Sequence, residues 1–199
     1  MEAVGLISHA ASAQVNTDVG ANTGLGIRLR TGTPKPVAAI AGIDVRGHVA
    51  LVPLVRVGVY AGLEGTLPNG SEDRLYYAFG LDAKVASPWT PAPWHTWAFV
   101  GVGAAYVVAT RHAVAGSSDT GGSGMQSSQA DGALVELPVG VGAGIRVHST
   151  WAIDAVLSAR PAIASFGPES RPSPGPDTQP FAGHELLAVW LTVGVSFCR

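Results

Sequence analysis

The sequence is short of charge, of cysteine and of long apolar runs, and each shortage excludes a class of protein. Asp, Glu, Lys and Arg make up 13% of the 199 residues, about half of the ~25% usual in a soluble domain. The net charge of −2 gives no electrostatic basis for binding nucleic acid. The lone Cys198 excludes an intrachain disulfide and a cysteine-based metal site. No apolar run reaches the roughly 18 residues of a transmembrane helix, so the sequence predicts none.

What the sequence has instead is a regular alternation of apolar with small or polar residues. Between Leu75 and Val85 the odd-numbered positions are all apolar, whereas the even-numbered positions from Tyr76 to Lys84 are small or polar. A period of two is the pattern of a β-strand whose two faces meet different surroundings.

The same alternation recurs in eight segments, with no sustained helical period and no second domain. We therefore expect an all-β chain, an eight-stranded antiparallel up-and-down barrel spanning residues 19–199. The expected strands are Val19–Arg30, Val37–Arg46, Ala50–Gly65, Leu75–Ala86, Thr96–Thr110, Ala133–Val147, Trp151–Ala164 and Glu185–Cys198.

The connections differ in length from one end of the expected barrel to the other. Tight turns are expected at Gly47-His48 and at 148–150, whereas Arg111–Asp131 and Ser165–His184 are long and rich in Gly, Ser or Pro. Long structureless loops are uncommon in a compact soluble domain. They are typical of an outer-membrane barrel, whose extracellular loops are long and whose periplasmic turns are short.

Alternation alone does not say which face is inside, so two barrels remain open. One is a transmembrane barrel with lipid outside; the other is a soluble lipocalin-like barrel that binds a small apolar ligand inside. The expected strands are longer than the 5–6 residues common in soluble proteins. The face that carries the charged residues also carries the glycines, and this suits a narrow lumen, because glycine leaves room there for long side chains. Four aromatic residues fall near strand ends, where a membrane interface would place them: Tyr77, Tyr106, Trp151 and Phe197.

If the polar face lines the lumen, charges of both signs point inward. They would have to pair, because an unpaired buried charge is costly. We expect a salt-bridged polar plug, with a narrow, arginine-biased solute path as the alternative. The expected lumen charges are Arg28, Arg30, Asp44, Arg46, Arg56, Glu64, Arg74, Asp82, Lys84, Glu136, Arg146, Asp154 and Arg160.

Signals for catalysis are weak. The glycines from Gly140 to Gly144 lie within an expected strand and do not form a nucleotide-binding loop, and no Gly-x-Ser-x-Gly motif is present. The pair His148-Ser149 could serve a lipid-modifying hydrolase, but it falls in a short turn on the wrong side of the barrel. We expect no enzyme, no catalytic residue, no cofactor and no metal site.

From Val19 to Cys198 the chain resembles the small eight-stranded outer-membrane β-barrels, the OmpA- and OmpW-like group. Such chains usually end in an aromatic residue that the barrel-assembly machinery reads; Val193–Phe197 resembles this signal, although Cys198 and Arg199 follow it. The resemblance implies a monomer in the outer membrane, in contact with lipid and with that machinery, in a structural, surface-interaction or narrow permeability role. The small residues Ala11-Ser12-Ala13 suggest a cleavage site, so residues 1–18 are expected to be a signal-peptide remnant or a plain tail.

Overall fold

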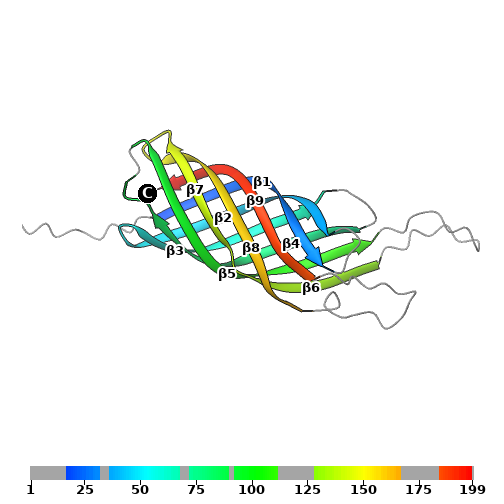
Figure 1. The fold of residues 1–199 in the computed structure, drawn as a ribbon. Coiled ribbons are helices and arrows are strands. Elements are labelled where there is room, and N and C mark those ends of the chain that lie inside the picture. Colours follow the sequence, from blue (N-terminus) through cyan, green and yellow to red (C-terminus); the bar gives the residue numbers. More distant parts are fainter. Residues whose placement is uncertain are drawn as a thin grey trace, which may run out of the picture.

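Alternating side chains along the nine strands of the described part of the chain build a closed antiparallel barrel in the computed structural model (Figure 1). The structure describes residues 17–31, 36–67, 72–89, 92–111, 128–166 and 184–198. The strands are β1 (Thr17–Thr31), β2 (Val37–Val52), β3 (Val55–Thr66), β4 (Glu72–Ala86), β5 (Trp94–Arg111), β6 (Ser128–Glu136), β7 (Val139–Arg146), β8 (Trp151–Phe166) and β9 (His184–Cys198).

Each strand pairs with its neighbours around the ring, and β9 pairs with β1 to close it. We use the word stave for one of the eight positions around the ring. β6 and β7 together form one stave, because both pair with β5 in a single register, with Gly103 opposite Glu136 and Val100 opposite Val139. The interruption falls at Leu137-Pro138, since proline has no N–H for the ladder. The expected eight-stranded up-and-down barrel is thus confirmed, with one of its eight staves written as two strands.

One turn lies at a different place from the one that the sequence predicts. The tight connection between β2 and β3 lies at Pro53-Leu54 and not at Gly47-His48, so β2 continues to Val52, past the expected end at Arg46. Gly47 looked like a turn residue but faces open space on the outside of the barrel, with nothing within 4 Å of where its Cβ would lie. The error had a consequence, because it removed His48 from the expected lumen.

The two faces of the barrel have opposite chemistry. Large apolar side chains on the outside are exposed, for example Leu25 at 63% and Leu191 at 61%. Charged side chains on the inside are buried, for example Arg28 at 1% and Glu136 at 0%. An apolar surface of this extent needs an apolar environment, and a lipocalin-like barrel would have the reverse arrangement. The outer face is therefore a lipid-facing belt.

The two ends of the barrel also differ. The strand ends that flank Pro53-Leu54, 87–93 and 147–150 lie at one end, here called the turn end, together with the first residue of β1 and the last of β9. The strand ends that flank 32–35, 68–71, 112–127 and 167–183 all lie at the opposite end, here called the loop end (Figure 1). Those four segments and residues 1–16 lie outside the described residues, and so do most of the expected tail and of the two long loops.

The sheet reaches further into the expected loops and tail than the sequence indicated. β5 ends at Arg111 and β6 begins at Ser128, and β1 begins at Thr17 within the expected tail. No helix among the described residues is long and apolar enough to span a membrane.

Candidate functional site

The inward face of the strands carries the chemistry of this molecule, and its charges gather in two clusters along the barrel. Strand alternation decides which side chains face inward, since every second residue of a strand points into the lumen. The loop-side cluster comprises Arg28, Arg30, Glu64, Arg74, Tyr76, Glu136, Arg160 and Glu185. The turn-side cluster comprises Asp18, Asp44, Arg46, His48, Arg56, Asp82 and Lys84.

Arg28 is the centre of the loop-side cluster. Its Nη2 donates to Glu64 Oε2 at 2.7 Å and its Nη1 donates to Glu136 Oε1 at 3.0 Å, so one guanidinium from β1 joins β3 and β6. The second oxygen of Glu64 accepts from Arg160 on β8. The guanidinium carbon of Arg28 also lies 3.9 Å from the centroid of the Tyr76 ring, a cation–π contact.

Glu185 collects the remaining cations of this cluster. Its Oε1 accepts from Arg74 Nη1 at 3.1 Å and from the Tyr76 hydroxyl at 2.7 Å, and it lies 3.1 Å from Arg30 Nε. The loop-side cluster therefore sets its arginines against three glutamates and draws on β1, β3, β4, β6, β8 and β9. Charge-assisted hydrogen bonds of this kind are the strong ones, and here they connect strands that are not neighbours in the sheet.

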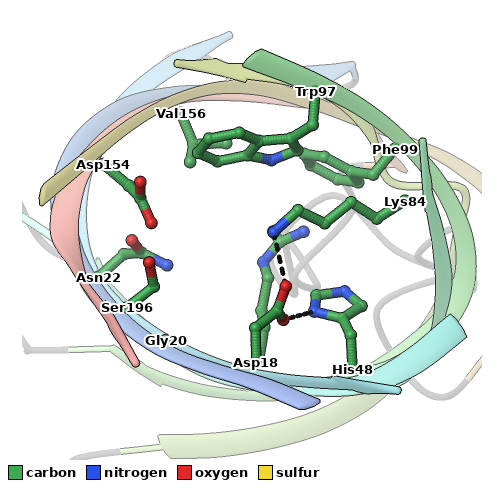
Figure 2. Close-up of a pocket in the computed structure, with 11 residues that line it drawn as sticks. Asp18, Gly20, Asn22, His48, Lys84, Trp97, Phe99, Asp154, Val156 and Ser196 are labelled. Carbon is green, nitrogen blue, oxygen red and sulfur yellow. Dashed lines mark hydrogen bonds and ion pairs between the residues drawn. The ribbon is translucent and has the colours of Figure 1, made fainter. Parts of the chain in front are cut away.

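Asp18 and His48 organise the turn-side cluster. Asp18 lies 2.7 Å from His48 Nδ1 and accepts from Lys84 Nζ at 3.1 Å and from Arg56 Nη1. The other ring nitrogen of His48 lies 2.8 Å from Asp82. Figure 2 shows Asp18, His48 and Lys84 turned toward one another on one side of the lumen.

Arg46 extends the turn-side cluster toward the loop side. Its Nε donates to Asp44 at 2.6 Å and its Nη1 donates to Asp82 at 3.1 Å. The Tyr60 ring lies between the two clusters, 5.7 Å from the Arg46 guanidinium carbon and 5.8 Å from that of Arg160.

Aromatic side chains face the turn-side cluster across the lumen. Trp97 and Phe99 on β5 lie opposite Asp18 and His48 in Figure 2. The Lys84 ammonium is 4.5 Å from the Trp97 ring centroid, and the Arg46 guanidinium carbon is 4.2 Å from that of Phe99. Between these walls remains a cavity of about 30 Å³, room for a water molecule or two.

Glycines make space for these inward aromatics. A Cβ on Gly142 would overlap the Trp97 indole, and one on Gly103 would overlap the Tyr60 hydroxyl. Gly142 is the residue paired with Trp97 on the neighbouring stave. The sequence predicts that glycine suits a narrow lumen; the side chains accommodated at these two positions come from the same side of the ring, Trp97 from the neighbouring strand and Tyr60 from two strands away.

The structure brings most of the sequence-predicted lumen charges into these clusters. Asp154 lies apart from both and is 2.9 Å from His95 Nε2. Arg146 does not join them, because it is the last residue of β7 and is exposed at the turn end. The four expected interface aromatics form two contacts, Tyr77 with Tyr106 at 6.5 Å and Trp151 with Phe197 at 5.2 Å between ring centroids.

Sequence reasoning missed Asp18, His48 and Glu185 as lumen charges. Asp18 was assigned to the tail and His48 to a turn, although both share the parity of inward neighbours on their strands. Extending the alternation by one or two residues beyond the expected strand ends would have found these two. Glu185 has the parity of the outward set of β9, and it turns inward because the register with β1 shifts between Leu29 and Arg30.

Metal binding finds no support in this interior. Among the described residues, no group of three or more His, Cys, Asp or Glu is arranged to hold a metal ion.

No protein-family model and no curated protein sequence matches the chain. Solved structures do. Neisserial surface protein A superposes with a TM-score of 0.58 at 14% identity, over 92% of this chain and 96% of that one. A major outer membrane protein of Thermus thermophilus gives 0.59 at 14%, over 93% and 99%. Ail, the attachment invasion locus protein of Yersinia pestis, gives 0.53 at 10%, over 93% and 99%.

The chain has the outer-membrane β-barrel fold. At these identities the likeness concerns the fold alone, and the apolar belt described above independently makes this barrel a transmembrane one. The more specific resemblance to the OmpA- and OmpW-like group stays a prediction, because no family model matches the chain.

Proposed function

We propose that this chain is a non-conducting outer-membrane β-barrel: a structural scaffold whose lumen is closed by paired charges and whose loop end faces the outside of the cell. It performs no catalysis in this proposal. The observation that carries the proposal is the position of Arg28, which reaches from β1 to carboxylates on β3 and β6 and so crosses the lumen.

The energetics of the interior support a closed lumen. Each cluster balances its charges within one unit, counting His48 as neutral, and most of the side chains in both are buried. Separating a buried ion pair leaves uncompensated charge, which costs about 3–5 kcal/mol. An ion path along the axis would require several such pairs to separate at once.

Conductance measurements test this proposal directly. Purified protein, refolded and inserted into a planar lipid bilayer in concentrated KCl, should give no discrete current steps. The triple variant R28A/E64A/E136A, which removes three crossing side chains, should give them. The exposed Arg146→Ala serves as the matched control and should stay silent. Heat-dependent mobility in SDS gels verifies that each variant is folded. Regular current steps from the wild-type barrel would overturn the proposal and favour the narrow solute path.

The orientation has its own test. Short turns on the periplasmic side and long connections outside are the rule for this architecture. Protease added to intact cells should therefore cleave within 112–127 or 167–183 and spare the turns at Pro53-Leu54 and 147–150. Cleavage only after the cells are broken open would contradict the proposed orientation.

We further propose that β9 carries the assembly signal, read through Phe197 by the barrel-assembly machinery. Phe197 lies next to the last residue of β9 and packs against Trp151 edge-on. Phe197→Ala should slow insertion in cells, while Trp151→Ala, which removes the same contact from the other side, should slow it less. Equal slowing by both variants would assign the effect to packing.

A further inference from the structure

A large hollow lies outside the lumen. It is a groove of about 830 Å³ on the lipid-facing surface near the turn end, over β5, β7 and β8. Its floor is made of three exposed alanines, Ala98, Ala143 and Ala155, on those three neighbouring strands. Its walls include Leu54 and Trp89 on one side and Leu157 on the other.

The hollow follows from side-chain size along two rows of the sheet. In one row Ala98 pairs with Val141, which pairs with Leu157; in the next row toward the turn end Ala143 pairs with Ala155. Small residues at these positions lower the floor between larger neighbours. Behind the floor, Trp97 and Val156 point inward and are buried.

Both the surface and the dimensions of the groove suit an acyl chain. It is continuous with the apolar belt, where Val85, Leu157 and Leu191 are about half or more exposed. A volume of this size lies within the range of pockets that enclose whole small ligands. Nothing in the lining is charged, and its exposed polar side-chain groups lie toward the turn end, at Ser87 and the indole of Trp89.

The groove also has a direction. At the turn end it begins beside Trp89, which is 88% exposed, and Ser87, whose hydroxyl accepts from the Trp89 backbone N–H at 3.3 Å. Tryptophan at the headgroup level is a feature of membrane interfaces. From there the groove leads over the alanine floor toward Leu157 and Leu191, which belong to the lipid-facing belt.

We propose that this groove is a binding site for one phospholipid of the periplasmic leaflet, with the headgroup beside Trp89 and an acyl chain lying on Ala98, Ala143 and Ala155. The site rests on the proposed membrane orientation and is independent of whether the lumen conducts. It differs from ordinary annular lipid in holding one molecule at a defined place.

Native mass spectrometry of the protein released from detergent micelles tests the site, with palmitoyl-oleoyl phosphatidylethanolamine added as the probe. The wild-type barrel should retain one phospholipid. Ala143→Phe and Ala155→Phe, which fill the floor, should weaken retention about tenfold. Ala61→Phe is the matched control, because Ala61 is also an exposed alanine and lies on β3, away from the groove. It should retain lipid as the wild type does.

A second variant guards against misfolding. Trp89→Ala removes one wall at an exposed turn position, leaves the core untouched and should also weaken retention several-fold. Equal retention in all folded variants would overturn the proposal, and so would a dimer that Ala143→Phe abolishes, since the occupant would then be a second copy of the chain. A wild-type protein that is soluble without detergent would instead contradict the proposed function itself. The heat-dependent gel shift tests that proposed function separately from the lipid site.

Discussion

Arg28 and Glu136 are 108 positions apart in the sequence and meet in the lumen, with Arg28 Nη1 donating to Glu136 Oε1 at 3.0 Å. Both side chains are almost completely buried. The pair connects β1 across the lumen to β6, and these two strands are not neighbours in the sheet. It therefore links the barrel through its interior as well as around its wall.

Removing Arg28 should destabilise the barrel strongly. Arg28→Met leaves Glu136 without its cation and Glu64 with Arg160 alone, and breaking a buried pair costs about 3–5 kcal/mol. Urea titrations of folding into lipid vesicles measure the free energy of unfolding. Arg146→Met, at an exposed position, should change it by no more than about 0.5 kcal/mol. Similar values for the two variants would show that the interior pairing contributes little.

The glycine beside Trp97 should tolerate no side chain. Gly142→Ala places a Cβ into the indole and should lower the free energy of unfolding by about 1–3 kcal/mol, the usual cost of overpacking. Gly47→Ala is the control, since nothing lies within 4 Å of its Cβ. In a Trp97→Val background, where the indole is absent, Gly142→Ala should lower the free energy of unfolding by less than it does in the wild type. An equal cost in the two backgrounds would assign the effect to the backbone.

Depth in the membrane should govern the cost of a charge on the outer face. Leu25 lies midway along β1 and Val19 near its turn end, and both are exposed. Leu25→Arg should cost about 2–4 kcal/mol in vesicles and Val19→Arg about 0–1 kcal/mol. Equal costs at the two depths would mean that this face does not span a bilayer.

The aromatic contact at the turn end should be energetically coupled. Trp151 and Phe197 are directly paired across β8 and β9, with ring centroids 5.2 Å apart in an edge-to-face arrangement. A double-mutant cycle with alanine at both positions should give a coupling energy of about 0.5–1.5 kcal/mol. Strictly additive losses would show that the two rings contact lipid independently of each other.

Much of the barrel could be predicted from the sequence because strand alternation is local information. The outward set that includes Leu25, and the inward set that includes Arg28 and Glu64, follow from parity once a strand is recognised. Strand ends were less well predicted, since His48 looked like a turn residue and Asp18 like part of a tail. Nothing nearby in the sequence distinguishes Gly47, which faces open space, from a glycine that makes a turn.

The sequence by itself determined the fold class, the number of staves and which residues face inward along most of each strand, because a period of two and the order of short and long connections are encoded residue by residue. Only the tertiary structure decided which charges meet. Closing the ring brings Arg28 to Glu136 and Asp18 to Lys84, and this depends on the stagger between staves, which no single strand specifies. The pairing of β5 with β7 and of β7 with β8 also places Ala98, Ala143 and Ala155 near one another, so the outer groove exists only in the assembled sheet.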